Sequence, residues 1–300
     1  MNMKSTHSNP PSRLLLALLA STLLSGFGPL RPTTLPPGSL GFADATVAFG
    51  SGVTALTSNP AGMAQRRENN VEVAIDRDLG RQGTSVLAAM IDSTSSSGLT
   101  AGVAYGYDNG SQVGAIKREG SNLRLGAAAG AGGPAGMVFI GGAMNRLKIS
   151  HDDGKRREIN GWTGDLGVVV ALAGALRLGF SYRNIIELDP LETPQRMAAG
   201  MAIIASPVLL SSEGSWNLQG GMATYRLGAA AMLGDTLQIR AGYIHDSAQQ
   251  DQSSQQVVCA GIGARFGRTN FDLGISVPIS SPGDPRIGIG LTYNMPANFQ

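Results

Sequence analysis

A two-residue alternation of apolar and small or polar residues recurs in segment after segment of this 300-residue chain, from about residue 70 onward. Near the C-terminus, Ile287, Ile289 and Leu291 alternate with Gly288 and Gly290. A period of two predicts β-strands, because successive side chains of a strand point to opposite faces of the sheet. Each expected strand therefore has one apolar face and one small or polar face.

The alternation repeats in about fourteen segments. Arg and Asp residues fall consistently on the non-apolar face, whereas a helical period would scatter them around all sides. The expected segments begin near residues 70, 83, 98, 121, 136, 159, 175, 195, 207, 222, 236, 256, 270 and 286. Their number and length predict an all-β protein, a transmembrane antiparallel β-barrel of about fourteen strands over residues 65–300.

The connections between these segments alternate in length. Short joins such as 173–174 and 267–268 lie between longer polar connections over residues 108–120, 150–158, 184–194, 246–255 and 280–285. Extracellular loops and periplasmic turns alternate in this way when both termini are periplasmic. The alternative is a secreted soluble β-sandwich. A barrel is favoured over it, because the second face is rich in Gly, Ala and Ser rather than in Lys, Glu and Thr.

The N-terminal region predicts export. Lys4 and Arg13 precede an apolar run from Leu14 to Leu24, which is shorter than the ~20 residues of a membrane-spanning helix. We place a signal peptide at residues 1–28, with an uncleaved signal anchor as the alternative, and an extended Pro- and Thr-rich linker at residues 29–37. Together with the barrel pattern, this predicts the outer membrane of a Gram-negative bacterium, surrounded by outer-membrane lipid.

Composition and motifs argue against several function classes. The basic residues are dispersed and form no patch with aromatics, so nucleic acid is not an expected partner. Residues 130–135 superficially match a phosphate-binding loop, but Pro134 and a second β-pattern follow where a helix should begin. His151 and His245 have no partner at metal-ligand spacing, and Glu192 is interpreted as a turn residue. We predict no metal, no cofactor and no enzyme, although catalytic residues of a hydrolytic barrel need not be close in sequence.

Charged residues on the polar faces are expected to point into the lumen. On the lipid face, each would cost roughly 2–4 kcal/mol at mid-bilayer. The expected set is Glu72, Asp76, Arg124, Asp165, Arg177, Arg183, Arg196, Arg226, Arg240, Arg265, Asp272 and Arg286. Two interpretations remain open: an arginine-rich polar pathway, or an internal ion-pair network that fills and rigidifies the barrel.

The segment between the leader and the first strand carries a family resemblance. Small residues recur from Gly41 through Ala48 to Ala55, and the segment ends in Asn59-Pro60-Ala61-Gly62. This combination resembles the start of mature proteins in the FadL-like outer-membrane transport superfamily, including its shorter PorV-like branch. The motif match covers about 25 residues, and the strand pattern extends a weaker resemblance over most of the rest.

The resemblance implies a fourteen-stranded barrel with the N-terminal segment folded inside it as a hatch. Residues 38–64 would lie in the lumen, with Asn59, Pro60, Ala61 and Gly62 turning the chain into the first strand, as Asn-Pro suits a turn. The implied function is passage of a small hydrophobic or amphipathic molecule past this hatch. Long-chain fatty-acid channels carry large apolar extracellular loops that this chain lacks. The alternative is therefore a non-transporting PorV-like barrel that binds a secretion or surface protein, or serves in assembly.

Overall fold

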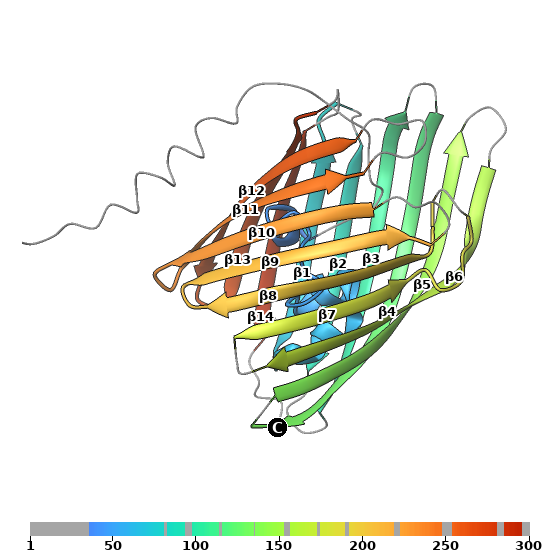
Figure 1. The fold of residues 1–300 in the computed structure, drawn as a ribbon. Helices are drawn as coiled ribbons and strands as arrows, with labels where there is room; N and C mark the ends of the chain where they lie inside the picture. The colour runs from blue at the N-terminus through green and yellow to red at the C-terminus, as the bar shows by residue number, and fades with distance from the viewer. Residues whose placement is uncertain are drawn as a thin grey trace, which may run out of the picture.

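The computed structural model describes residues 36–295 apart from 81–82, 94–97, 114–115, 135, 153–156, 173–174, 190–191, 219–222, 248–253 and 281–284. The predicted signal peptide and nearly all of the predicted linker lie outside these residues. The described chain forms fourteen antiparallel strands that close into one barrel around a short N-terminal helical segment (Figure 1). The predicted barrel with an N-terminal segment in its lumen is confirmed. A β-sandwich is wrong, because one continuous sheet closes on itself.

In the described part of the chain, three short helical turns precede the strands: α2 (Pro37–Leu40), α3 (Gly52–Ser58) and the 3₁₀ helix η1 (Pro60–Gln65). The strands are β1 (Asn69–Asp78), β2 (Thr84–Ser93), β3 (Leu99–Val113), β4 (Ile116–Gly133), β5 (Gly136–Asp152), β6 (Arg157–Leu172), β7 (Leu176–Arg183), β8 (Arg196–Ala205), β9 (Val208–Asn217), β10 (Ala223–Leu233), β11 (Leu237–Asp246), β12 (Gln255–Phe266), β13 (Thr269–Pro278) and β14 (Arg286–Met295). Within the described ranges, no helix is long and apolar enough to cross a membrane.

The alternation in the sequence separates the two faces of the barrel wall. In β1, Val71, Val73 and Ile75 are exposed on the outer surface, while Ala74 and Asp76 are buried inside. Other strands repeat this division, with large apolar side chains outside and small or polar ones inside. An apolar outer surface and a polar inner one are what a lipid-embedded barrel requires.

Strand β14 closes the barrel against β1. Val73 lies opposite Leu291, and both side chains are on the apolar outer face. Gly288 and Gly290 face the lumen, where an added Cβ would lie 3.3 Å and 3.1 Å from the nearest atom of Pro37. The small inner face of the closing strand therefore accommodates helix α2, which begins at Pro37, the last residue of the predicted linker.

The β3–β4 and β5–β6 hairpins are longer than predicted. The sequence predicts loops over residues 108–120 and 150–158, but β3 runs to Val113 before β4 begins at Ile116, and β5 runs to Asp152 before β6 begins at Arg157. These two loop predictions are wrong, because an antiparallel ladder continues with polar residues once the hairpin leaves the apolar band. By contrast, residues 184–189 and 192–195, between β7 and β8, form no strand.

The core of the protein lies between the N-terminal helical segment and the inner face of the wall. Leu56 of α3 and Met63 of η1 are almost fully buried and belong to one apolar cluster with Leu87 and Ile91 of β2. A Cβ added at Gly126 of β4 would lie only 2.5 Å from the Leu56 side chain, so any larger residue there would displace this buried leucine. In Figure 1 the blue helical segment accordingly lies within the ring of strands.

Candidate functional site

We call residues 36–65 the lumenal segment. Within it, Asn59 links the segment to the barrel wall. The Asn59 Nδ2 group donates to the Val47 carbonyl oxygen at 2.7 Å and to those of Val168 on β6 and Phe180 on β7 at 3.2 Å each. Its Oδ1 accepts a hydrogen bond from the Ala61 amide at 3.3 Å, which caps η1. This one buried side chain therefore joins two parts of the lumenal segment to two neighbouring strands.

The rest of the Asn-Pro-Ala-Gly turn packs closely against other backbone. A Cβ added at Gly141 on β5 would lie 2.6 Å from both Pro60 and Ala61 backbone atoms. A Cβ at Gly62 would lie 2.2 Å from the Gly50 carbonyl oxygen, so no larger residue fits without a backbone shift. The turn leads into η1, and β1 begins only at Asn69, a few residues later than the family resemblance implies.

Lumen arginines on one side of the barrel form ion pairs. The pairs are Arg226 with Glu213 at 2.7 Å, Arg240 with Asp272 at 2.5 Å, and Arg286 with Asp76. We call this side, formed by β9–β14 and β1, the paired side. Glu213 is absent from the predicted lumen set, because the Val208–Trp216 segment has the weakest alternation. Its Oε2 also accepts a hydrogen bond from the Val47 amide of the lumenal segment, at 3.2 Å.

Two other predicted lumen residues make polar contacts without an ion pair. Asp165 on β6 accepts hydrogen bonds from Asn145 Nδ2 and from the Asn184 amide, each at 2.9 Å. Arg177 on β7 donates to Gln65 Oε1, and thereby contacts the end of the lumenal segment. Asp165 thus fixes the start of the β7–β8 loop, whereas Arg177 fixes the lumenal segment.

The remaining predicted residues lie in different environments. Glu72 of β1 is buried on the paired side. Arg196 is partly buried at the start of β8. Arg265 is exposed beside the β12–β13 turn and donates to the Gly267 carbonyl oxygen at 3.4 Å. Arg265 is therefore at the rim of the barrel and not in its enclosed lumen.

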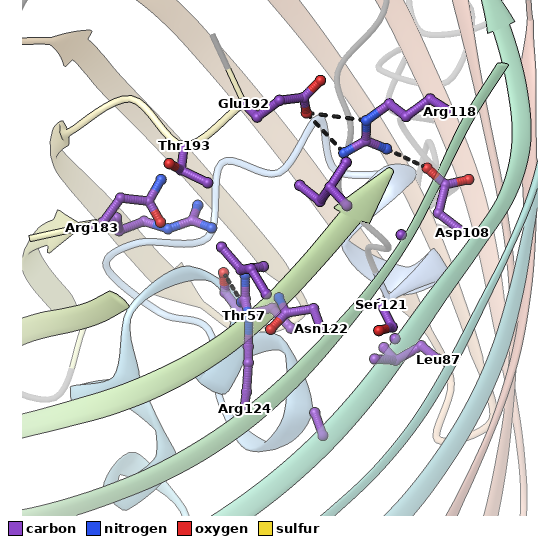
Figure 2. Close-up of a pocket in the computed structure, with 16 residues that line it drawn as sticks. Thr57, Leu87, Asp108, Arg118, Ser121, Asn122, Arg124, Arg183, Glu192 and Thr193 are labelled. Atoms are coloured by element: carbon purple, nitrogen blue, oxygen red, sulfur yellow. Dashed lines mark hydrogen bonds and ion pairs between the residues drawn. The ribbon is translucent and has the colours of Figure 1, made fainter. Parts of the chain in front are cut away.

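A cavity of about 100 Å³ lies between the lumenal segment and the β7–β8 loop (Figure 2). We call it the chamber. Thr57, in the last turn of α3, lies at one side, and Glu192 and Thr193 of the loop lie at the other. The lining combines apolar side chains with polar ones, namely Leu87, Ala104, Leu147 and Ile149 with Arg118, Asn122, Arg124 and Arg183. Such a lining binds the polar end of a small molecule and shelters its apolar part.

Two arginines of the chamber form no ion pair with a residue that the structure describes, although Asp165 and Glu213 act on them through space. Arg124, only 7% exposed, donates from Nη1 to the Thr57 carbonyl oxygen at 3.0 Å, and its Nε has no hydrogen-bond partner in the described part of the chain. The Arg183 side chain makes no hydrogen bond or ion pair with any residue that the structure describes. Both were predicted to face the lumen, and the structure brings them together at one cavity.

A series of charged groups connects the β7–β8 loop to the wall. Arg118 lies between Asp108 at 2.6 Å and Glu192 at 3.0 Å (Figure 2), and His151 Nε2 lies 2.7 Å from Glu192 Oε1. Burial raises the pKa of Glu192, but the Arg118 charge and the hydrogen bonds from Arg118 and His151 outweigh it, so the pKa is below its ordinary value. The sequence places His151 at the start of a polar loop, whereas it lies on β5, opposite Arg118 of β4.

The chamber contains groups that bind charge, and no assembled metal site accompanies them. Across the described ranges, no three His, Cys, Asp or Glu residues cluster so that they could hold a metal ion. The lining instead combines guanidinium groups, carboxylates and apolar side chains.

The barrel is similar to solved outer-membrane channels. The TodX monoaromatic hydrocarbon channel deltaS2 mutant aligns with a TM-score of 0.64 at 13% identity, over 88% of this chain and 98% of that chain. A Pseudomonas aeruginosa FadL homologue aligns with a TM-score of 0.59 at 13% identity, over 90% of this chain and 100% of that chain. No protein-family model and no curated protein matches the sequence. The chain therefore has the fold of the FadL and TodX outer-membrane channels.

Proposed function

We propose that this protein is a bacterial outer-membrane channel that passes small hydrophobic or amphipathic molecules past the lumenal segment, which acts as a hatch. The apolar outer face of the wall supports a place in lipid. The fold shared with a monoaromatic hydrocarbon channel supports a substrate of low polarity. The observation that carries the proposal is the chamber, whose lining is part apolar and part cationic and which the lumenal segment borders on one side.

Movement of the lumenal segment is the step that we propose for passage. Within the described ranges, few hydrogen bonds join this segment to the wall. Besides those of Asn59, they run from Ser211 to Ala45, from Val47 to Glu213, from Arg124 to Thr57 and from Arg177 to Gln65. Neighbouring strands, by contrast, are joined by ladders along their paired lengths. The segment can therefore shift at a smaller cost in hydrogen bonds than any strand.

Uptake of radiolabelled toluene by cells of a Gram-negative host tests the proposal, because an intact outer membrane slows the entry of apolar molecules. Cells that produce the full chain should take up toluene faster than cells with an empty vector. Substituting Asn59→Ala should raise the rate further by loosening the hatch. Equal uptake with and without the protein would contradict a channel for hydrophobic molecules.

The outer-membrane location and the leader are part of the same proposal. We expect residues 1–28 to be removed on export, so that the mature protein retains the lumenal segment. N-terminal sequencing of the mature protein checks the cleavage. Faster migration of unboiled than of boiled protein on a gel checks the barrel in the membrane fraction. A single band of unchanged mobility would contradict a closed membrane barrel.

A non-transporting, PorV-like role in binding a secretion or surface protein is the second candidate. One observation favours it: Ile186, at the start of the β7–β8 loop, is 58% exposed at a point where a partner could dock. The two candidates differ in what Ile186→Asp should do. Loss of a cross-linked partner with unchanged toluene uptake supports partner binding, while absence of any cross-linked partner counts against it.

A further inference from the structure

We propose that Arg146 and Lys148, on the outer surface of strand β5, bind the phosphate groups of a glycolipid in the outer leaflet of the membrane. The site lies on the outside of the barrel wall, so it is separate from the lumenal segment and from the chamber. It rests on the outer-membrane location in the proposed function and does not depend on transport.

The outer face of β5 changes from apolar to basic along the strand. Ile140 and Met144 are 59% and 58% exposed on this face. Further along, the alternation brings Arg146 and Lys148 to the same face, and both are exposed. Asn145, the residue before Arg146, is only 1% exposed and points into the barrel, as the alternation requires. Basic side chains that directly follow an apolar band lie where the lipid tails end and the head groups begin.

This part of β5 lies at the end of the barrel opposite the start of β1 and the end of β14. Asn69, where β1 begins, pairs with Met295, where β14 ends. Strand β5 runs in the same direction as β1, because each strand from β1 to β5 is antiparallel to the next. The long β3–β4 and β5–β6 hairpins extend at this end (Figure 1). Since longer connections of outer-membrane barrels are extracellular, Arg146 and Lys148 face the outer leaflet.

Aromatic side chains lie at the same level of the wall. Trp162 on β6 lies opposite Arg146, and the centre of its ring is 5.7 Å from the guanidinium carbon of Arg146. On the other side of β5, Arg146 lies opposite Leu123 of β4, and Leu123 lies opposite Tyr105 of β3. Trp162 and Tyr105 are 39% and 49% exposed. Trp and Tyr are enriched where lipid tails meet head groups, which supports the level assigned to the basic pair.

The contacts of Arg146 orient its guanidinium group and leave donors available. Its Nη2 donates to Asn160 Oδ1 at 2.7 Å, and its guanidinium carbon lies over the Trp162 ring. With the residues that the structure describes, Arg146 makes this one hydrogen bond and no ion pair. Most N–H donors of the guanidinium therefore remain free, and their forked arrangement matches the oxygens of a phosphate.

The protein compensates the charge of Lys148 only weakly. Its Nζ lies 3.5 Å from Glu158 Oε1, and the two side chains are 63% and 52% exposed. An exposed pair of this kind contributes little, so the ammonium can contact another anion. Lys148 and Arg146 are two residues apart on one strand face, about 7 Å along β5. Both charges can therefore act on one phosphorylated head group.

The apolar residues below the basic pair distinguish a lipid from a free anion. Phosphate ions need only the two cationic groups, whereas a glycolipid also places acyl chains against the exposed side chains of Ile140 and Met144. The outer leaflet of a Gram-negative outer membrane is rich in a glycolipid whose sugars carry phosphate. Basic residues beside a membrane recognise such anionic head groups.

Fluorescence of Trp162 tests the site, because Trp162 and Trp216 are the two tryptophans of the sequence. Full-length protein with Trp216→Phe is placed in vesicles of brominated phosphatidylcholine, which quenches the fluorescence of a tryptophan that it contacts. Lipid A should displace the brominated lipid and restore the fluorescence, measured for each variant against its own value without lipid A. The double variant Arg146→Gln and Lys148→Gln should need about tenfold more lipid A. Arg265→Gln, which removes an arginine from the rim, is the matched control and should need the same amount as the intact protein.

Three results would overturn the site. They are equal displacement by lipid A in the intact protein and the double variant, equal displacement by lipid A and by dephosphorylated lipid A, and reversal of the recovery by inorganic phosphate, which would indicate binding of the free anion. Heat-dependent gel migration verifies that each variant has formed its barrel. Toluene uptake separates the two proposals: uptake without a preference for lipid A removes only the glycolipid site, whereas a preference for lipid A without uptake counts against the channel alone.

Discussion

The two sides of the lumen treat buried arginine in opposite ways. On the paired side, each of three arginines forms an ion pair with a carboxylate: Arg226, Arg240 and Arg286. The distance from Arg226 Nη1 to Glu213 Oε1, for example, is 2.7 Å. At the chamber, Arg124 and Arg183 form no ion pair with a described residue, and the two carboxylates of the lining, Asp108 and Glu192, pair with Arg118 instead. All five arginines are on the lumen faces of their strands. Facing the lumen therefore does not by itself determine whether an arginine forms an ion pair.

The difference teaches that the ion-pair interpretation of the lumen charges describes the paired side, whereas a polar pathway at the chamber stays a prediction. The ion pairs of the paired side satisfy their own charges and fix the lumenal segment through the Glu213 contact to Val47. The chamber leaves charge available beside apolar side chains. We therefore expect substitutions on the paired side to change stability, and substitutions at the chamber to change binding.

The largest effect on stability is expected on the paired side. Glu213→Ala leaves Arg226 buried with only Ser215 as a partner and removes the acceptor for the Val47 amide. Removing one partner of a buried ion pair costs about 3–5 kcal/mol. Urea unfolding in lipid vesicles, followed by tryptophan fluorescence, measures the change. If Arg183→Gln proved equally destabilising, the contrast between the two sides would be wrong.

Loosening the lumenal segment should have an intermediate effect. Asn59→Ala removes the contacts to Val168 and Phe180 and leaves the Ala61 amide unpaired, at a cost of about 1–3 kcal/mol. Native-state hydrogen exchange should then rise in residues 36–65 more than in the strands. Ser58→Ala is the control, because the Ser58 hydroxyl bonds only within α3, to the Thr54 carbonyl. Equal exchange in both variants would contradict an anchoring role for Asn59.

Acid should weaken the contacts between the β7–β8 loop and the barrel wall, because it protonates Glu192. Because the folded pKa of Glu192 is lowered, its contribution to loop closure is complete above the ordinary Glu pKa of about 4.3 and is lost as the pH falls through the lower folded value. The groups that face this carboxylate are Arg118 and His151. Channel conductance should stay level between pH 7 and 5 and rise below pH 4. In Glu192→Gln it should already be high at pH 7, and an identical acid response in that variant would exclude Glu192 as the cause.

The smallest effect is expected at the rim. Arg265 is exposed and donates only to the nearby Gly267 carbonyl, so Arg265→Gln should change the unfolding free energy by less than about 0.5 kcal/mol. Urea unfolding alongside Glu213→Ala gives the comparison directly. A loss of several kcal/mol at this position would mean that arginines in general, and not their ion pairs, stabilise the barrel.

Most of the fold could be predicted, because a strand with one face toward lipid and the other toward the lumen alternates apolar with small or polar residues. Strands such as β1 and β14 carry that pattern over their whole lengths, and their pairing follows from closure. The ends of β3 to β6 could not be predicted, because polar residues beyond the apolar band form strand or loop equally well. For the same reason, the sequence does not predict the register of the long hairpins, and so it does not predict that His151 and Arg118 lie opposite each other.

The partners of the lumen arginines could not be read from the sequence. Arg286 and Asp76 are 210 residues apart and meet only because β14 pairs with β1. Glu192 reaches Arg118 only because the β7–β8 loop folds back toward the lumen. The sequence predicts which face of a strand each side chain occupies. Which arginines lie beside a carboxylate depends on the pairing of strands far apart in the sequence.

The central claim is that the lumenal segment closes a channel, and single-channel conductance in planar bilayers tests it most directly. A variant that lacks residues 38–64 but keeps its leader is compared with the full chain, and heat-dependent gel migration verifies that its barrel has formed. Asn59→Ala serves as a second, milder variant with the segment still in place. We predict a clearly larger conductance for the deletion and a smaller increase for Asn59→Ala. Unchanged conductance in a properly folded deletion variant would contradict the account.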